Sequence, residues 1–378
     1  MSAAAFCVVG LPPSAGHPPA RLPRPPASPA RRPEPQTGSG LAIYRRLHYT
    51  AAMFAPLLPI LQEHRNIGII SHFRPDGDAI GSLIALGLAL RQLGKQVSLW
   101  NEDPVPARYR FLEGSELIAP LPEQRPDDID LLICLDTGDW KRLGDRACAL
   151  LADIPLKVNI DHHATNTRFG DCNIIDPGCA ATGYIVQRLL QTLGCPLTPA
   201  IAAALYTAIS TDTGSFQYSS TTPGVMRAAA DLIAAGIDVG DINRRLYQEQ
   251  PLSTLIVQRE VLNHFIVEER GMLSHYSMEA GTKERLGISL EDTKDLVDII
   301  RVIRGVKASA IFEDLEDGRI RISLRSKDPR VNVADIAGQF GGGGHIMAAG
   351  IRMRGTLSDC RERVLNALRQ TLRTLPAD

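Results

Sequence analysis

The chain has 378 residues, of which 44% are hydrophobic and 22% are charged, so it is long enough to form two domains with separate cores. Its formal net charge is only −1, which argues against a surface rich in lysine and arginine that binds long nucleic acid through many phosphates, but allows small phosphorylated ligands. No apolar run approaches the roughly 18 residues that span a bilayer, and the seven cysteines form no CxxC pair, so we expect a cytoplasmic protein with no membrane role, zinc cluster or disulfide framework.

Residues 1–52 differ in composition from the rest of the chain. Residues 10–40 contain ten prolines and several arginines, with Glu34 as the only acidic residue. Such a segment cannot bury a core, so we expect a disordered, dispensable tail, with Met53 as an alternative start of the working protein. The charge also suits a transit peptide, but the prolines oppose its amphipathic helix.

An α/β pattern begins at residue 54. The apolar run "NIGIIS" predicts a strand over 66–71, a helix follows over 79–94, and "QVSLW" predicts the next strand over 96–100. Buried strands are also predicted over 131–135 and 156–161. Strands that alternate with helices indicate a doubly wound, mostly parallel sheet, whose ligands gather at the carboxyl ends of the strands.

Further elements divide the chain into domains. Two helices, over 199–211 and 224–236, place Asp212 between them. We expect the first domain over 53–245, a helical linker over 246–262 and a smaller α/β domain over 263–376, with the active site in the cleft between the domains. The second domain has predicted strands over 264–269, 272–278, 308–314 and 319–326, and predicted helices over 289–303 and 358–375.

Polar clusters follow the predicted strands of the first domain. In "HFRPDGD", His72, Asp76 and Asp78 supply ligands that suit Mn, Mg or another first-row divalent ion. A polar turn in which one aspartate caps the helix is the alternative.

Three further sites repeat this pattern. Asp161, His162 and His163 end another strand, and adjacent histidines are hard to place in a core because each ring needs a partner. Asp136 follows a third strand, and Asp212 lies in "STDTG". A surface loop, a helix cap and a simple turn are the respective alternatives. Together these loops predict a pair of ions bridged by a carboxylate, which could hold a phosphoryl group and lower the pKa of a water.

The second domain carries four consecutive glycines, residues 341–344, followed by His345. Glycines let a backbone approach a ligand closely and turn its N–H groups toward an anion. Arg325 could add a bidentate contact with a phosphate. A flexible loop is the alternative.

These motifs, in this order, resemble those of the DHH phosphoesterases. The matching segments are HxxPDGDAxGS at 72–82, the strand end at Asp136, DHH at 161–163 and STDTG at 210–214. Residues 325–350 are similar to the DHH-associated substrate-binding domain. The resemblance covers about residues 54–375. Length and domain content are closest to the bacterial bifunctional oligoribonucleases and PAP phosphatases.

The resemblance implies two Mn²⁺ ions, with Mg²⁺ or Co²⁺ as alternatives. The first ion would take three ligands, His72, Asp76 and Asp136. The second would share the bridging Asp136 and take three more, Asp78, His162 and Asp212. His163 would face the scissile phosphate, and Asp161 would orient the histidines. These two residues and Asp136 would form the catalytic group. The substrate clamp would consist of Arg325, Gly342, Gly343, Gly344 and His345.

The implied activity is hydrolysis of short nucleotide substrates. These are short oligoribonucleotides, the linear dinucleotide pApA, cyclic di-AMP, and 3′-phosphoadenosine 5′-phosphate (pAp), which would yield AMP. A pyrophosphatase or exopolyphosphatase shares the metal motifs, although the glycine-rich clamp argues against it. A RecJ-type single-strand exonuclease would need extra domains, and a nucleotide-binding regulator would lack turnover. The oligomeric state stays open, with a homodimer as one alternative.

Overall fold

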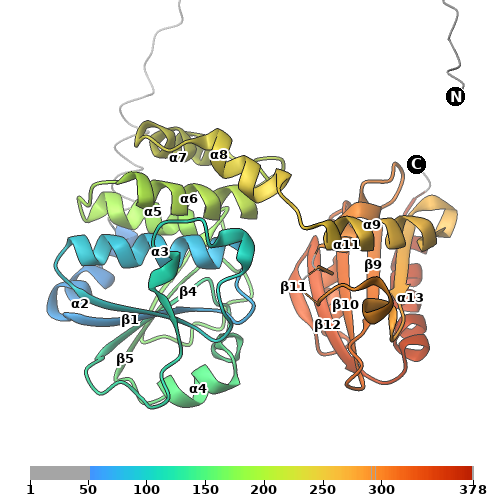
Figure 1. Cartoon of the computed structure of the whole chain (residues 1–378), viewed down its shortest axis with the longest axis horizontal. Coiled ribbons are helices and arrows are strands. Elements are labelled where there is room, and N and C mark those ends of the chain that lie inside the picture. The colour runs from blue at the N-terminus through green and yellow to red at the C-terminus, as the bar shows by residue number, and fades with distance from the viewer. Residues whose placement is uncertain (1–51, 291, 294, 377–378) are drawn as a thin grey trace, which may run out of the picture. The chain divides into compact units, whose positions relative to one another are not determined.

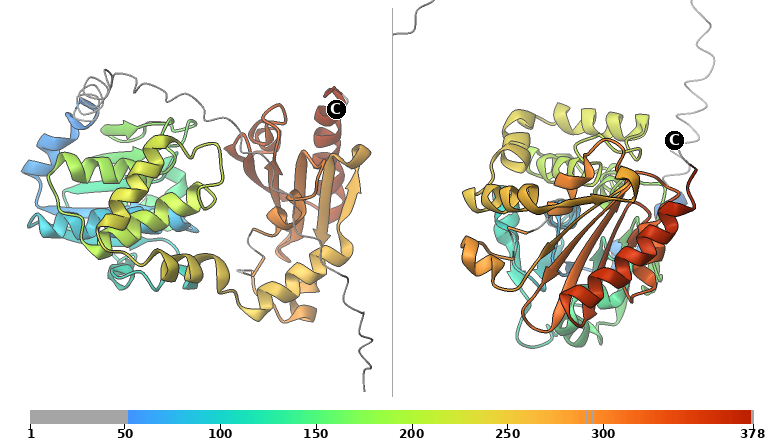
Figure 2. Two further views of the ribbon diagram at one scale, coloured as in Figure 1. Left: turned by 90° about the horizontal axis from the view of Figure 1, so that it is seen from above. Right: turned by 90° about the vertical axis from the view of Figure 1, so that its right-hand side faces the viewer.

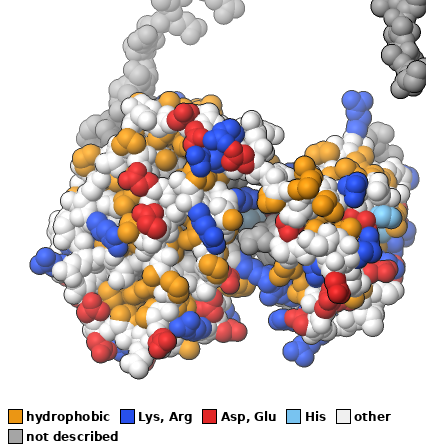
Figure 3. All heavy atoms as spheres, viewed as in Figure 1, with side chains coloured by type: hydrophobic (Ala, Val, Ile, Leu, Met, Phe, Trp, Pro, Cys, Tyr) orange, Lys and Arg blue, Asp and Glu red, His pale blue; other side chains and the backbone are white. Residues whose placement is uncertain are grey.

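The structure of the protein is a computed structural model that describes residues 52–376 except 291 and 294. The expected disordered tail therefore lies outside the described residues, apart from Ala52. Among the residues described, no helix combines the length and apolar character needed to cross a membrane. On the face shown in Figure 3, acidic and basic side chains are intermingled, as the net charge near zero suggests.

A six-stranded parallel sheet forms the centre of the first domain (Figure 1). Its strands are β1 (Asn66–Ser71), β2 (Gln96–Asn101), β3 (Ile118–Pro120), β4 (Leu131–Leu135), β5 (Leu156–Asp161) and β6 (Cys172–Ile175). The spatial order is β3-β2-β1-β4-β5-β6, so the direction of winding reverses between β1 and β4. Ligands bind at such a reversal in doubly wound sheets. The predicted fold class is confirmed.

Helices cover both faces of this sheet. They are α2 (Leu57–Glu63), α3 (Gly77–Gln92), α4 (Asp145–Leu151), α5 (Thr182–Thr192), α6 (Pro199–Asp212), α7 (Pro223–Ala234) and α8 (Val239–Asn243), with short 3₁₀ turns at Ala107–Tyr109, Ser115–Leu117 and Trp140–Leu143. The views in Figures 1 and 2 place α3, α5 and α6 on the face opposite α4. Alternate strand residues serve the two cores, since Ile69 packs with the α3 side and Ile70 with the α4 side.

Helices α3 and α6 pack closely because Gly81 has no side chain. A Cβ at this position would lie 2.3 Å from the carbonyl oxygen of Ala204. This packing fixes the start of α3 relative to the end of α6. Asp212, expected between two helices, is instead the last residue of α6. The helix continues that far because the Thr213 hydroxyl donates to the Ile209 carbonyl at 2.6 Å and so binds the last turn.

The second domain has a mixed six-stranded sheet in the order β11-β12-β10-β9-β8-β7. The strands are β7 (Ile266–Glu268), β8 (Leu273–Met278), β9 (Ala308–Asp314), β10 (Arg319–Ser326), β11 (Gly343–His345) and β12 (Ala348–Arg354). Only β8 and β9 pair in parallel among these described strands. The sequence predicted β7 to β10 but missed β11 and β12, whose small residues lack the usual strand composition.

Five α-helices accompany the second sheet: α9 (Leu252–His264), α10 (Thr282–Leu286), α11 (Leu296–Arg301), α12 (Val333–Gly338) and α13 (Leu357–Arg373). A π-helical turn, Arg244–Gln248, precedes α9, and a 3₁₀ turn occupies Glu269–Gly271. The long α13, red in Figure 2, packs through Leu365 and Leu368 against the same core as Phe312. Helices α9 and α11 share a separate core with Ile311.

The helix expected over 289–303 is much shorter in the structure. Helix α11 covers only Leu296–Arg301. Before it, the Asp292 carboxylate accepts a hydrogen bond from the Ser289 backbone N–H at 2.7 Å, and Asp295 has a left-handed φ of +59°. Side chains of this kind compete with helical hydrogen bonds, which explains the late start.

Candidate functional site

The predicted polar residues of the first domain meet at the carboxyl ends of the central strands. His72 directly follows β1, Asp136 follows β4, and Asp161 ends β5. The register aligns these ends, since Ser71 pairs with Leu135 and Leu135 with Ile160. His162 and His163 come next after Asp161, and Asp212 arrives from the end of α6.

Asp76 and Asp78 enter the site from the start of α3. Asp76 is the N-cap, and its Oδ1 accepts hydrogen bonds from the backbone N–H groups of Asp78 and Ala79, both at 3.1 Å. The helix-cap alternative is thus correct for Asp76, but it does not exclude a metal role because a carboxylate has more lone pairs than these two bonds use. Asp78 is buried in the first turn.

Three groups of potential metal ligands contain Asp136; one consists of Asp136, Asp161 and His163, and the other two bring a histidine Nε2 next to the Asp136 carboxylate. In the first of these two, His72 Nε2 lies 3.5 Å from Asp136 Oδ2 and 3.9 Å from Asp76 Oδ1. In the second, His162 Nε2 lies 3.6 Å from Asp136 Oδ1 and 3.8 Å from Asp78 Oδ2. Asp136 therefore turns a different oxygen toward each of these two groups, which suits a carboxylate that bridges two ions.

The spacing of these atoms suits small divalent ions. Ligand atoms in each group lie within 4.8 Å of one another. Adjacent ligands of an octahedral ion with bonds of about 2.1 Å are about 3 Å apart, so a slight contraction would bring the ligand atoms of each group to bonding distance of one ion. Asp212 Oδ2 lies 3.4 Å from His162 Nε2 and can join the second group.

The two histidines are oriented by backbone carbonyls. His72 Nδ1 lies 2.9 Å from the Phe73 carbonyl oxygen, and His162 Nδ1 lies 3.3 Å from that of Cys179. A carbonyl only accepts, so each Nδ1–H donates and Nε2 is the ring atom that faces the carboxylates. A metal ion would bind through this nitrogen after the nitrogen has lost its proton.

The clustered carboxylates of this site shift the pKa values of their neighbours. Burial and repulsion from Asp136 and Asp212 raise the pKa of Asp78 well above its usual value. Burial, with repulsion from Asp136, raises the pKa of Asp212 to about 7. Burial opposes charge on His72, but its hydrogen bonds with Asp136 and Asp76 raise its pKa to about 10. These shifts show buried negative charge that divalent cations would compensate.

The backbone of Asp136 adopts an unusual conformation. Its φ is +54°, a left-handed value that costs a non-glycine residue about 1–2 kcal/mol. The Asp136 N–H still donates to the Ile160 carbonyl at 3.0 Å. This conformation occurs at the residue whose carboxylate faces both ligand groups, and Arg74 in the loop between His72 and Asp76 also has a left-handed φ of +56°, which supports a functional interpretation of this site.

Thr182 and Gly183, at the start of α5, are functional neighbours that the sequence did not reveal. Their backbone N–H groups donate to Asp78 at 2.6 and 2.8 Å, and the Thr182 hydroxyl donates to Asp136 Oδ1 at 3.0 Å. Because these contacts span 104, 105 and 46 residues, no local pattern could have assigned them.

His163 forms a separate pair with Asp161. Its Nδ1–H donates to Asp161 Oδ1 at 2.6 Å, and Asn166 donates to Asp161 Oδ2 at the same distance. Burial opposes the charged ring, but the hydrogen bond with Asp161 raises the pKa of His163 to about 9. The His345 ring of the second domain stacks on His163, with centroids 4.7 Å apart. Burial, followed by repulsion from His163, lowers the pKa of His345 to about 4.

The glycine run of the expected clamp lies in a hairpin. The N–H groups of Gly341 and Gly342 donate to the carbonyls of Gly338 and Ala337, and Gly343 to His345 pair with β12. The run is therefore not a free loop, and the N–H groups of Gly341 and Gly342 already have partners. Its glycines serve close backbone packing, since a Cβ on Gly342 would lie 2.3 Å from the Gly350 oxygen. Arg325 points to other partners, with its Nε 3.5 Å from Asp298.

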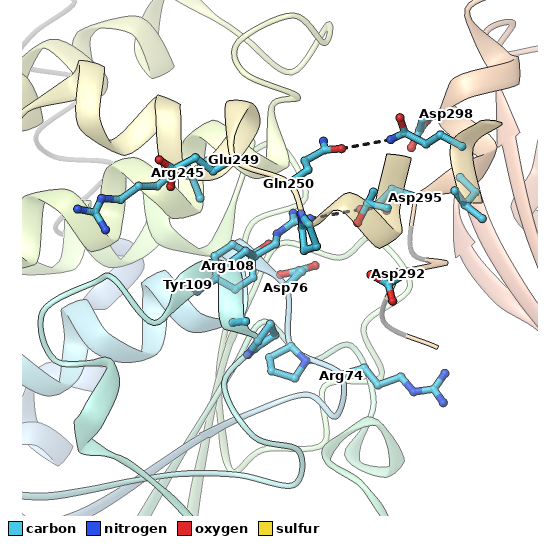
Figure 4. A pocket seen from close by; sticks show the side chains of 18 of the residues that line it. Arg74, Asp76, Arg108, Tyr109, Arg245, Glu249, Gln250, Asp292, Asp295 and Asp298 are labelled. Atoms are coloured by element: carbon cyan, nitrogen blue, oxygen red, sulfur yellow. Dashed lines mark hydrogen bonds and ion pairs between the residues drawn. The ribbon is translucent and has the colours of Figure 1, made fainter. Parts of the chain in front are cut away.

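A cavity of about 820 Å³ opens beside Asp76 (Figure 4). It carries charges of both signs, from Arg74, Arg108, Arg245, Glu249, Asp292, Asp295 and Asp298. The Arg108 side chain reaches toward Asp295 within it. The sequence predicted none of these cavity residues except Asp76.

This architecture and this site define a two-domain α/β protein with paired His–Asp ligand groups at the reversal of a parallel sheet. The chain belongs to the DHH family: residues 66–209 match the DHH family N-terminal domain, and residues 279–374 match the DHHA1 domain. The resemblance inferred from the motifs is confirmed.

Curated relatives cover most of the chain. It is 37% identical over 312 residues to the bifunctional oligoribonuclease and PAP phosphatase NrnA of Thermus thermophilus, a match that spans 81% of this chain and 90% of the relative. The Bacillus subtilis protein of the same name is 26% identical over 301 residues, 79% of this chain and 92% of the relative. Among solved structures, an exopolyphosphatase-related protein from Bacteroides fragilis has a TM-score of 0.78 and 28% identity, over 85% of this chain and 98% of that chain.

Proposed function

We propose that this DHH hydrolase cleaves short oligoribonucleotides to mononucleotides and removes the 3′-phosphate of pAp to give AMP. The observation that carries this proposal is the 37% identity, over most of both chains, to a protein named for these two activities. The two ligand groups around Asp136 supply the site that such hydrolysis requires. We extend the proposal to pApA and cyclic di-AMP as substrates.

We assign the site to two divalent ions, Mn²⁺ in both positions. His72, Asp76 and Asp136 would hold the first ion. Asp136, Asp78 and His162 would hold the second, and Asp212 lies close enough to His162 to join them. The mixture of imidazole and carboxylate suits Mn²⁺, and Mg²⁺ or Co²⁺ could replace it. When bound, such ions hold a phosphoryl group and lower the pKa of a water.

His163 acts on the substrate and not as a ligand of either ion. Its Nδ1–H is engaged by Asp161, so Nε2 is the ring atom free to contact a phosphate oxygen. Asp161 fixes the ring, and Asn166 in turn fixes Asp161. The bridging Asp136 completes the catalytic group.

The second domain binds the remainder of the substrate. His345 supports this role because its ring stacks on His163, next to the proposed reaction centre. Arg325 supplies a cation, and Gly342, Gly343 and Gly344 give the thin hairpin that carries His345 to this place. A hairpin at the reaction centre favours short ligands over a long strand that would have to pass it.

Hydrolysis of pyrophosphate or polyphosphate is the second candidate. The exopolyphosphatase-related protein from Bacteroides fragilis, with a TM-score of 0.78, favours it. A phosphoanhydride would use the same two ligand groups.

Parallel assays of the full chain with Mn²⁺ distinguish the two candidates. We expect rapid loss of pAp and pApA and little action on pyrophosphate or a long single-stranded RNA. Asp136→Ala should abolish turnover, whereas Asp153→Asn, an exposed carboxylate of the same domain, should not. Preference for pyrophosphate would favour the second candidate. Binding of pAp without turnover by the wild-type chain would instead indicate a regulator.

A further inference from the structure

One carboxylate of the second domain lies between two arginines. Asp295 Oδ2 is 3.5 Å from Arg108 Nη1, and Asp295 Oδ1 is 3.8 Å from Arg325 Nη2. Arg108 belongs to the 3₁₀ turn Ala107–Tyr109 of the first domain, and Arg325 lies on β10. The two oxygens of one carboxylate thus face one guanidinium each.

These ion pairs are loose and partly exposed. Both distances exceed those of a good hydrogen bond, and the Asp295 and Arg108 side chains are 58% and 45% exposed. Exposed pairs of this kind contribute little to stability, so a stronger anion can displace the carboxylate. A phosphate carries more charge and one more oxygen, and guanidinium groups bind it in bidentate geometry.

The surroundings connect Arg108 with the proposed reaction centre, and Arg325 contacts the same carboxylate from outside the cavity lining. Arg108 and Asp295 line the cavity that opens beside Asp76, a proposed metal ligand (Figure 4). Arg245, which also lines this cavity, donates a hydrogen bond to Asp241 at 2.8 Å. Arg108 is instead oriented by its own neighbour, since its guanidinium lies 4.9 Å from the centre of the Tyr109 ring. Arg108 is therefore held toward the cavity, where its acidic partner Asp295 contacts it only loosely.

We propose that Asp295 occupies the position of the substrate's second, non-reacting phosphate, and that Arg108 together with Arg325 selects ligands that carry this phosphate. The inference rests on the proposed function, because it concerns the same substrates. Arg108 becomes a specificity-determining residue supplied by the catalytic domain. Asp295 becomes a competitor that a nucleotide with a single phosphate does not have to displace.

Two substrates test this assignment. pAp and 3′-AMP share the reacting 3′-phosphate, and only pAp has the 5′-phosphate. In Arg108→Gln we expect the KM for pAp to rise roughly tenfold or more, because one charge-assisted contact is lost, with kcat and the KM for 3′-AMP nearly unchanged. In Asp295→Asn the competitor is weakened, so the KM for pAp should fall. In the double variant this fall should disappear.

Asp317→Asn is the matched control, because it removes an acid from another exposed ion pair of the same domain, with Arg319. Melting curves and Mn²⁺ affinity confirm that each variant is folded. The inference would be overturned if Arg108→Gln raised the KM for both substrates equally. It would also be overturned if Asp295→Asn raised the KM for pAp. If the wild-type chain turns over neither pAp nor short RNA, the proposed function fails; calorimetric binding of pAp and 3′-AMP to the same variants still decides the role of Arg108.

Discussion

The Thr182 hydroxyl gives a sharp test of how the ligand groups are positioned. It donates to Asp136 Oδ1 at 3.0 Å, and both residues are almost fully buried. Thr182→Val keeps the shape and the backbone N–H that binds Asp78, and removes only the hydroxyl. A hydrogen bond to a buried charged group contributes about 1.5–3 kcal/mol, and loss of such an outer contact weakens metal binding by about 10–100-fold. We therefore expect the Kd for Mn²⁺ to rise within that range.

Calorimetric titration of the full chain with Mn²⁺ measures this effect directly. Thr182→Ser should bind almost as well as the wild type, since it restores the hydroxyl. Thr192→Val removes a hydroxyl from the same helix, one that donates to the Arg188 carbonyl at 2.9 Å, and should leave the Kd unchanged. Wild-type affinity in Thr182→Val would refute the reasoning, as would equal losses in Thr182→Val and Thr182→Ser.

Three further outcomes follow from packing, titration and linkage. Gly342→Ala should lower the melting temperature markedly because its Cβ would lie 2.3 Å from the Gly350 oxygen, whereas Gly343→Ala meets open space and should be nearly neutral; equal effects would contradict the hairpin. Burial lowers the pKa of His275, so below about pH 6.5 the unfolded chain binds a proton there more readily than the folded chain does. The free energy of unfolding should therefore decrease as the pH is lowered, and urea titrations of His275→Gln should show a smaller decrease. Addition of Mn²⁺ at about 100 times its Kd should raise the free energy of unfolding by about 2.7 kcal/mol for each ion bound, and Asp136→Ala should lose most of that increase.

The sequence predicted those site residues that directly follow a recognisable strand. His72, Asp136 and Asp161 each come at the end of an apolar run, and in a parallel sheet such ends share one edge. The pattern could therefore bring them together without a structure. The positive φ of Asp136 was not predictable, because an aspartate after a strand usually enters an ordinary turn.

The parts that the sequence missed depend on contacts between distant segments. Thr182 meets Asp136 across 46 residues, and Arg108 meets Asp295 only when the two domains are both in place. The glycine run was expected to bind an anion through its N–H groups. Those of Gly341 and Gly342 instead donate to two carbonyls in the last turn of α12. Composition indicates that a backbone can approach something closely, and it does not indicate what that partner is.

The shared role of Asp136 follows from the order of the strands. Strand β4 lies between β1 and β5, and its last residue, Leu135, pairs with Ser71 on one side and Ile160 on the other. The next residue therefore has the His72 loop on one side and the His162 loop on the other. A residue that follows β1 or β5 would reach only one of the two groups. Among these strand ends, a bridging carboxylate can thus stand only after β4, and the left-handed turn at Asp136 directs one oxygen to each side.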